Sequence, residues 1–478
     1  MQGKYTIKRN TIKKVVKNSS SVAEEIKSSG IARKSISDEI HINIITYARV
    51  DTSNASRLLS PVDAEARKTA LSQKRKRRAV RNLDLKSAPA IPTAPKDPKV
   101  RRRQWLFSLI KTHLGLIDVP FLALSVILCI IGLISINSAT KTFESPKFII
   151  VQFAGIILGL FCALALSVID YRSFISKYRY IIAFNVALLL ITYIFGSSVT
   201  EGTNSNWIDL GIIKIQPSEF AKLFFIYSFA VHLSQVRDSM HKVTTVLTLG
   251  IHAAIIFGLV LLQKDLGSLT IFFVIFICMC FAAGISVWYY IAGSAALVCV
   301  SPFIWSHLSD YQKNRIMLCF DESIDPLGTG IRYQQLRSQT AIGNGGIFGA
   351  GYTNGAVTQG LSDHLPAKHT DMIFSTFCEE WGFIGACVVL ILTTLLILRA
   401  FKIALSCGNS IGRYICVGVA SMLMIQVIEN VGMCLGIMPV IGITFPFLSY
   451  GGSSILSCFL AAGLVLSVST HMDNSIFK

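Results

Sequence analysis

The sequence predicts an all-α integral membrane protein with ten spans, cytoplasmic N- and C-termini and one large extracellular loop between spans seven and eight. Its 478 residues have a mean hydropathy of +0.56, 52% of them are hydrophobic and only 15% are charged. Soluble globular domains carry about 25% charged residues, so this composition excludes that class. The net charge of +18 is uneven, because residues 1–103 hold 25 Lys and Arg against 9 Asp and Glu. A basic total can indicate nucleic acid, but the nearly neutral apolar body favours lipid, and no nucleic-acid partner is expected.

Residues 1–103 lack an apolar core pattern and are predicted to form a largely disordered cytoplasmic tail. Lys74 to Arg81 is a dense cationic block, and prolines then recur at every third position from Pro89 to Pro98, the period of a polyproline II spacer. The tail is interpreted as a solvated segment that keeps the N-terminus inside, or as a contact for anionic lipid headgroups. A contact with a partner protein or a nucleic acid is a third interpretation. Residues 104–118 fit a helix lying flat at the membrane interface.

The body, residues 119–470, divides into apolar stretches of about 20 residues, the length that spans a bilayer core. A short cytoplasmic C-terminus, residues 471–478, follows them. The ten predicted spans are Pro120–Asn137, Phe148–Val168, Tyr180–Phe195, Pro217–Leu233, Thr244–Leu262, Leu269–Ala283, Val287–Ile304, Met372–Leu398, Ile411–Ile437 and Ser453–Val468.

The orientation follows from the basic residues of the short loops, because Lys and Arg stay on the cytoplasmic side. With the tail inside, the inner loops hold eight basic residues: Arg172, Lys177, Arg179, Arg237, Lys242, Arg399, Lys402 and Arg413. The outer loops hold four: Lys141, Lys147, Lys214 and Lys264. The bias places both termini in the cytoplasm and the long loop, residues 306–371, outside.

Ionisable residues at membrane depth are costly and are functional candidates. Glu219 and Lys222 lie three residues apart and can pair on one helix face, either as a structural ion pair or as a polar wall of a substrate cavity. The polar turn before the sixth span is explained by a helix N-cap at Asp265 or Ser268. Further acidic residues within the spans are Glu379, Glu380 and Glu429.

The long external loop is rich in charge and contains a glycine-rich run from Gly343 to Gly351. By itself the run fits either a flexible hinge or a close approach of two backbones. An external loop of about 60 residues is uncommon unless it forms a functional structure of its own. Its cationic residues can hold a pyrophosphate, and a carboxylate at the membrane edge can act on a lipid-linked substrate.

Seven strings in this body resemble those of the SEDS family, the bacterial RodA, FtsW and SpoVE proteins. In order they are G-T-N-S-N-W-I-D-L-G (residues 202–211), Q-P-S-E-F-A-K (216–222), D-P-L-G-T-G (325–330), A-I-G-N-G-G-I-F-G-A-G (341–351), L-P-A-K-H-T-D-M-I-F (365–374), C-E-E-W-G (378–382) and P-F-L-S-Y-G-G-S-S (446–454). The resemblance runs from about Pro120 to the C-terminus and does not include the basic tail.

The resemblance implies a ten-helix glycosyltransferase of the bacterial cytoplasmic membrane that polymerises lipid II into peptidoglycan strands. It implies that the protein acts together with a class B penicillin-binding protein in cell-wall elongation or in determining cell shape. It also implies a bound Mg²⁺ or Mn²⁺. The family's catalytic aspartate corresponds to Asp371, and its paired cavity residues to Glu219 and Lys222. The strings around Ala341 and Lys368 favour the RodA branch, whereas Gly442 to Pro446 favours FtsW and SpoVE, and RodA is the preferred assignment.

The chemistry of that reaction fits these residues. A base must remove the proton of the acceptor sugar's 4-hydroxyl while undecaprenyl pyrophosphate leaves the donor, and Asp371 can do so if an apolar site raises its pKa. Arg332, Arg337 and Lys368 are candidates for the leaving pyrophosphate by charge and position. His369 is a substrate-binding candidate, or a hydrogen-bonding residue that orients the turn at a helix start.

The sequence departs from the family pattern at two positions, and two other functions also fit it. Asn206 stands where the family usually has Arg, and Lys264 stands where it usually has Pro. Ten spans with intramembrane charges also fit a transporter, above all a flippase for the same lipid-linked precursor. A non-catalytic scaffold of a division or elongation complex is the third hypothesis.

Overall fold

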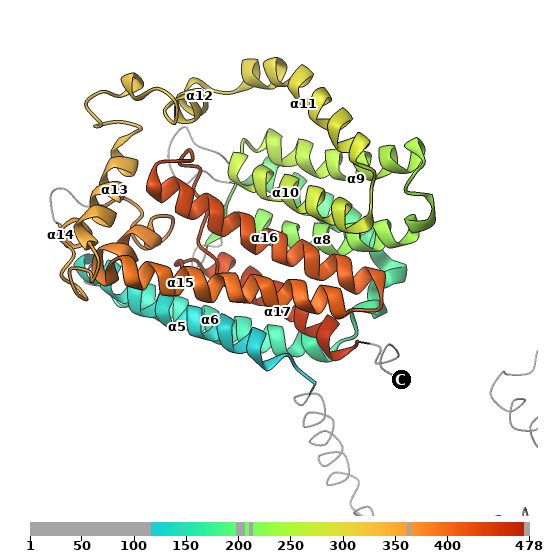
Figure 1. Ribbon diagram of the computed structural model, residues 1–478, viewed down its shortest axis with the longest axis horizontal. Helices are drawn as coiled ribbons and strands as arrows, with labels where there is room; N and C mark the ends of the chain where they lie inside the picture. Colours follow the sequence, from blue (N-terminus) through green and yellow to red (C-terminus); the bar gives the residue numbers. More distant parts are fainter. Residues whose placement is uncertain (1–115, 144, 197–205, 210–213, 361–364, 473–478) are drawn as a thin grey trace, which may run out of the picture. The chain divides into compact units, whose positions relative to one another are not determined.

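The computed structural model describes residues 116–143, 145–196, 206–209, 214–360 and 365–472. The tail predicted for residues 1–103, the segment 104–115 and the end of the C-terminus lie outside the described residues. The described part is almost entirely helical and forms a bundle of long helices (Figure 1). One small departure from the all-α prediction is an antiparallel pair of two-residue strands, β1 (Ile208–Asp209) and β2 (Lys214–Ile215).

Each predicted span coincides with a helix. These helices are α5 (Val119–Ala139), α6 (Lys147–Val168), α7 (Tyr178–Phe195), α8 (Pro217–Gln235), α9 (Val243–Leu262), α10 (Leu266–Ala283), α11 (Val287–His307), α15 (Ile373–Ser406), α16 (Ser410–Leu435) and α17 (Gly452–Thr470). Within the described ranges, nine helices are long and apolar enough to cross a membrane. The remaining one is α8, whose apolar sequence is interrupted by Glu219, Lys222 and His232 and which is largely buried among its neighbours.

The external loop has structure of its own, as expected. It contains α12 (Asp310–Met317), the short 3₁₀ helix η4 (Glu322–Ile324), α13 (Tyr333–Gly345) and α14 (Ala356–Gln359). The first of these helices begins with a capping box, in which Ser309 accepts from the Gln312 backbone and the Gln312 side chain accepts from the Ser309 backbone.

The centre of the bundle is built around α17, which packs along α6 (Figure 1). Small residues permit this contact: a Cβ on Gly159 would lie 2.6 Å from the Phe459 ring, and one on Gly463 would lie 2.9 Å from the Cα of Ala163. Close approach of backbones at small residues is a common basis of helix packing in membranes. By contrast, no residue of α11 is buried, and this helix lies along the outside of the bundle.

A break in α15 explains the glycine-rich run. Gly382 has φ 66° and ψ −168°, and beside this break the segment Gly346–Gly351 runs against the α15 backbone. Ala350 N donates to Glu379 O at 2.8 Å, and Phe383 N donates to Gly346 O at 2.9 Å. Of the two interpretations of the run, close backbone approach is therefore the one observed.

The two acidic residues before the break, Glu379 and Glu380, are buried. Glu379 accepts from the backbone nitrogens of Val357 and Thr358, each at 2.8 Å, and therefore holds the start of α14. Glu380 accepts from the Ser138 hydroxyl of α5. Glu379 thus connects the external loop to α15, and Glu380 connects α15 to α5.

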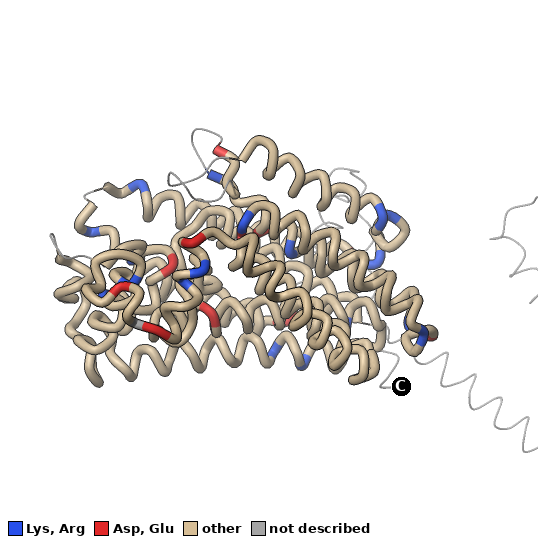
Figure 2. The backbone as a smooth tube through the Cα atoms, turned by 90° about the horizontal axis from the view of Figure 1, so that it is seen from above, with Lys and Arg blue, Asp and Glu red and all other residues tan. Residues whose placement is uncertain are grey.

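Charged residues are sparse along the helices (Figure 2). At the end where α5 begins, Arg399 Nη2 lies 2.8 Å from Asp118 Oδ2 and ties α15 to the N-cap of α5. Lys147, the first residue of α6, lies at the opposite end of the bundle, because α6 runs antiparallel to α5.

Candidate active site

A cavity of about 850 Å³ opens at the end of the bundle where α6 and α8 begin. Its walls come from segments far apart in the sequence: the strands before α8, the turn before α10, helix α12, the turn before α15 and the segment between α16 and α17. Trp207, Tyr311 and Tyr450 contribute aromatic surface. Its charged lining residues are Lys147, Asp209, Lys214, Lys264, Asp265, Arg315 and Asp371. Such a lining suits an anionic substrate that also has an apolar part.

Asp371 lies in the wall of this cavity, two residues before α15, and is partly exposed to it. Its main-chain carbonyl accepts a 2.7 Å hydrogen bond from Asn430 Nδ2 of α16. Its carboxylate packs against Gly442, because a Cβ there would lie 3.4 Å from Asp371 Oδ2. Gly442 also has φ +75°, which glycine adopts without strain. Backbone geometry on both sides therefore fixes the position of this carboxylate.

The electrostatics of Asp371 are those of a candidate base. Burial raises the pKa of its carboxyl to about 6, and the charge of Arg315 opposes that rise. Arg315 is held on α12 by donating from Nη1 to Val440 O at 2.7 Å and from Nη2 to the Tyr311 hydroxyl. A carboxylate with a pKa near 6 is ionised at neutral pH yet is a stronger base than an ordinary Asp.

The turn between α9 and α10 places a second cation in the cavity. Of the two caps that the sequence offered, Asp265 is the N-cap of α10 and accepts from Ser268 N at 2.9 Å. Lys264 precedes it with φ +57°, a left-handed conformation that is uncommon for Lys and unavailable to Pro. Lys264 O accepts from Gln312 Nε2 at 3.3 Å, which connects this turn to α12.

Glu219 and Lys222 form the expected ion pair, with Lys222 Nζ 2.7 Å from Glu219 Oε1. Both are buried, and Lys222 is completely inaccessible. The other carboxylate oxygen of Glu219 accepts from Ser457 Oγ at 2.8 Å, which joins α8 to α17. The pair lies one turn along α8 from Gln216, which does line the cavity. Of the two interpretations, a structural ion pair and a polar wall of a substrate cavity, these contacts fit the structural ion pair.

Lys368 and His369 belong to the same segment as Asp371 but lie outside the cavity lining. Lys368 Nζ donates to Thr358 O at 2.6 Å and to Thr142 Oγ1 at 2.8 Å, and burial lowers its pKa. The His369 ring contacts the ring of Phe148 at 5.1 Å between centroids. Burial, with the nearby Lys368 charge, lowers the pKa of His369 to about 4, so it is neutral at pH 7. These contacts orient the segment that carries Asp371.

Arg332 and Arg337 also lie outside the cavity lining. Arg332 precedes α13, and its backbone nitrogen donates to Asp325 Oδ2 at 3.0 Å. Arg337 lies on α13, with its guanidinium carbon 5.9 Å from the Tyr333 ring centroid. The structure thus does not bring these arginines together with Asp371.

Residues 116–474 match the sequence model of a protein family described as "Cell cycle protein", the FtsW, RodA and SpoVE proteins. The match covers about three quarters of the chain. The chain belongs to the FtsW/RodA/SpoVE family.

Individual members of this family are similar over most of the same region. Stage V sporulation protein E of Bacillus subtilis is 34% identical over 365 residues, which are 74% of this chain and 97% of that protein. Peptidoglycan glycosyltransferase MrdB of Escherichia coli K12 is 37% identical over 303 residues, 62% of this chain and 78% of that protein. The probable peptidoglycan glycosyltransferase FtsW of Geobacter metallireducens is 33% identical, with 75% and 96% covered.

Solved structures of the family share the fold. A chain from the structure reported as "Structural coordination of polymerization and crosslinking by a peptidoglycan synthase complex" matches with a TM-score of 0.63 and 29% identity. That match covers 75% of this chain and 99% of the other. The rod shape determining protein RodA of Thermus thermophilus matches with a TM-score of 0.55 and 25% identity, covering 75% and 98%.

The donor set expected for a divalent cation is not assembled by this family member's described residues. Among them, no group of three or more His, Cys, Asp and Glu side chains is placed to hold a metal ion. The Asp265 carboxylate is occupied by Ser268, and Asp209 lies 3.8 Å from Lys214 Nζ. The side chains of the described residues alone therefore do not form a site for a resident Mg²⁺ or Mn²⁺.

The basic residues that share the cavity with Asp371 are not the ones that the sequence suggested for binding the leaving pyrophosphate. Arg315, Lys147, Lys214 and Lys264 line the cavity instead of Arg332, Arg337 and Lys368. One sequence signal was available for Lys264, since it replaces the Pro that is usual in the family. For Arg315 no such signal exists, because its place depends on how α12 folds over the cavity.

Proposed function

We propose that this chain is a peptidoglycan glycosyltransferase that polymerises lipid II in the bacterial cytoplasmic membrane. The observation that carries the proposal is the Asp371 carboxylate, which has a pKa near 6 and lies in a cavity of about 850 Å³, lined by both basic and acidic residues, at one end of a membrane bundle. A substrate with sugars, a pyrophosphate and a polyprenyl tail needs both the polar cavity and the surrounding lipid. The relatives named peptidoglycan glycosyltransferases support the same assignment.

Asp371 acts as the general base. Its carboxylate takes the proton of the acceptor's 4-hydroxyl, the freed oxygen attacks the anomeric carbon of the donor, and a β-1,4 bond forms. The bond between that carbon and the pyrophosphate oxygen breaks, and undecaprenyl pyrophosphate leaves with the electron pair. Arg315, whose charge already acts on Asp371, and Lys264, which also lines the cavity, neutralise the leaving group in this proposal. A divalent cation held mainly by the substrate's phosphates would add charge there.

The proposed topology has ten spans and both termini in the cytoplasm. It counts α8 as a span in addition to the nine more apolar helices. The basic loop residues favour this orientation. The cavity then opens outside, at the end opposite to the start of α5. The lower apolarity of α8 is tolerated because its ion pair is buried within the bundle.

The partner in the proposal is a class B penicillin-binding protein. A related chain is found in a complex described as coordinating polymerization and crosslinking, which supports a crosslinking partner here. Within the family, the strings around Ala341 and Lys368 favour the RodA branch and hence cell-wall elongation or cell shape.

The decisive experiment supplies lipid II to the purified chain with its penicillin-binding partner, with and without a divalent metal. We expect glycan polymer from the wild type and almost none from Asp371→Ala. Asp310→Ala is the matched control, because that carboxylate is 96% exposed on α12 and should leave polymerisation unchanged. Equal polymer from wild type and Asp371→Ala would reject the base assignment. Translocation of lipid II by both without polymer would favour the flippase, and a working Asp371→Ala strain would favour the scaffold.

A further inference from the structure

A second hollow lies at the end of the bundle away from Asp371. Helix α8 links the two ends, because Gln216 just before it lines the large cavity and Gln235 at its end lines this hollow. Its 19 residues span roughly 28 Å, close to the thickness of a bilayer core. The hollow, of about 540 Å³, therefore lies at the opposite membrane surface. It is lined by Arg172, Ile175, Ser176, Tyr178, Arg179 and Gln235.

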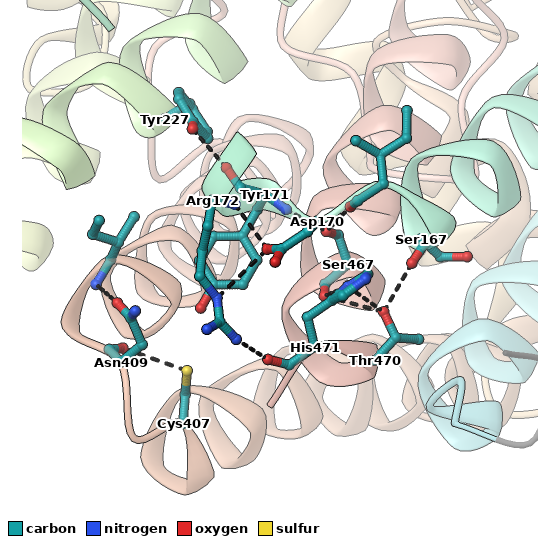
Figure 3. A network of polar contacts seen from close by, with 12 residues as sticks. Ser167, Asp170, Tyr171, Arg172, Tyr227, Cys407, Asn409, Ser467, Thr470 and His471 are labelled. Atoms are coloured by element: carbon teal, nitrogen blue, oxygen red, sulfur yellow. Dashed lines mark hydrogen bonds and ion pairs between the residues drawn. The ribbon is translucent and has the colours of Figure 1, made fainter. Parts of the chain in front are cut away.

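One of its arginines is held in place by neighbouring groups (Figure 3). Arg172 belongs to η2 (Tyr171–Lys177), the 3₁₀ helix that connects α6 and α7. Its Nη2 donates to the main-chain carbonyl of His471, and its Nε lies 3.5 Å from Asp170 Oδ1. The Arg172 side chain nevertheless keeps 29% of its surface exposed. A fixed guanidinium with an accessible edge needs little ordering to accept an anion.

The second arginine lies beside it on the first turn of α7. Arg179 is exposed, and its Nε donates to the Tyr178 hydroxyl at 3.4 Å. Lys177 precedes it and is exposed as well. Asp170 lies 3.5 Å from Arg172, and among the described residues that line the hollow two are arginines and none is acidic. The hollow thus has an excess of positive charge.

The hollow also has apolar residues in and next to its lining, here called its rim. Ile175 and Tyr178 line it, and Phe174 and Tyr180, next to these residues in the sequence, are 41% and 77% exposed. Aromatic residues beside Arg and Lys are typical of the membrane interface, where one part of the side chain contacts headgroups and another contacts acyl chains. A soluble anion would make no use of this rim.

We propose that the hollow formed by η2, the start of α7 and the end of α8 binds the phosphodiester headgroup of an anionic phospholipid. The two guanidinium groups contact the phosphate oxygens, and the apolar rim contacts the glycerol and the upper acyl chains. This site is separate from the proposed glycosyl transfer and does not depend on it.

Occupancy of the site stabilises the contact between η2 and the centre of the bundle. Tyr171, next to Arg172, accepts from the Tyr227 hydroxyl of α8 at 2.7 Å through its carbonyl. Its backbone nitrogen donates to Ser467 Oγ of α17 at 3.2 Å (Figure 3). Helices α8 and α17 are the two that also meet through Glu219 and Ser457. A lipid bound to Arg172 and Arg179 therefore strengthens a connection that extends to the core.

The test measures lipid binding to the purified full chain in a zwitterionic detergent, by melting temperature and by titration. The probes are short-chain phosphatidylglycerol, short-chain phosphatidylcholine and inorganic phosphate. We expect phosphatidylglycerol to raise the melting temperature and to bind more tightly than the other two. Arg179→Gln should lower the affinity for phosphatidylglycerol about fivefold, which is the effect of one basic residue near a charged surface. Arg179→Lys should retain most of the binding.

The control is Lys402→Gln, an exposed cation near the end of α15, at the same end of the bundle but outside the hollow. It should bind phosphatidylglycerol as the wild type does. An equal loss in Lys402→Gln and Arg179→Gln would show unspecific attraction and overturn the site. Wild-type binding in Arg179→Gln would overturn it too, and phosphate binding as tight as that of phosphatidylglycerol would overturn the lipid assignment. Arg179 is exposed, so its variants should keep the wild-type melting temperature without lipid, and binding can be compared directly.

Discussion

Asn430 of α16 holds the main chain of Asp371, since its Nδ2 donates at 2.7 Å to the Asp371 carbonyl. The same nitrogen donates at 2.7 Å to the carbonyl of Ile443 on the other side of the cavity wall. Asn430 is completely buried, so neither carbonyl has water as a substitute partner at this point. One amide group therefore fixes the candidate base relative to the segment that contains Gly442.

Replacing Asn430 should impair catalysis through the position of Asp371. Asn430→Asp keeps the shape but removes both donors when ionised, and each buried carbonyl left unsatisfied costs about 1–3 kcal/mol. We expect the polymerisation rate to fall at least tenfold and the melting temperature to fall by several degrees. Ser421→Ala is the control, because Ser421 is buried on the same helix and donates only within it, to Val417 O. If Asn430→Asp polymerises as fast as that control, Asn430 does not position Asp371.

The raised pKa of Asp371 predicts a pH-dependent rate. A general base must be deprotonated, so polymerisation should fall about tenfold per pH unit as the pH drops below about 6. The rate should be flat between pH 7 and 8 if no other group titrates there. The measurement is a single-turnover rate against pH on a fixed amount of enzyme. If the rate instead falls with a midpoint near pH 4, the pKa of the Asp371 carboxyl is not raised.

The same pKa predicts a cost in stability. The folded pKa near 6 exceeds the ordinary pKa of an aspartate carboxyl, 3.8, so the folded state binds more protons between these two values and loses stability as the pH rises through that window. The loss is at most ~3 kcal/mol, and less because the carboxyl faces the cavity. Asp371→Asn should therefore abolish polymerisation while raising the melting temperature at pH 7.5 and leaving it almost unchanged at pH 4. A lower melting temperature at pH 7.5 would contradict this.

The sequence predicted the features that depend on local pattern. Apolar length located a helix for each predicted span, nine of them apolar enough within the described residues to cross a membrane, the spacing of Glu219 and Lys222 predicted their ion pair, and the polar turn predicted a cap at Asp265 or Ser268. It did not predict the break at Gly382, because that break depends on backbone hydrogen bonds with a segment about 35 residues away. It also did not place Arg315 beside Asp371, since charge alone does not distinguish among the cations of a folded loop.

The break in α15 should not tolerate a side chain. A Cβ on Gly382 would lie 2.3 Å from Gly349 N and 2.5 Å from Ile347 O, and its φ of 66° is unfavourable for other residues. Gly382→Ala should therefore cost about 3 kcal/mol or more and reduce the folded yield. The control is Gly250→Ala on α9, where a Cβ meets nothing within 4 Å and helix propensity favours Ala. Thermal unfolding of both variants tests this, and equal melting temperatures would contradict it.

Lys264 and Lys368 should give opposite results, because one lines the cavity and the other is buried beside it. Lys264→Gln removes an exposed cation from the cavity lining, so it should raise KM for lipid II about three- to tenfold with little change in the melting temperature. Lys368→Met leaves Thr358 O without its 2.6 Å donor and removes a cation near Glu379 and Glu380. It should lower the melting temperature and the rate together, with KM nearly unchanged in the protein that remains folded. If Lys368→Met instead raises KM and keeps the wild-type melting temperature, Lys368 contacts the substrate. Its assignment from the sequence as a residue that binds the leaving pyrophosphate would then be correct.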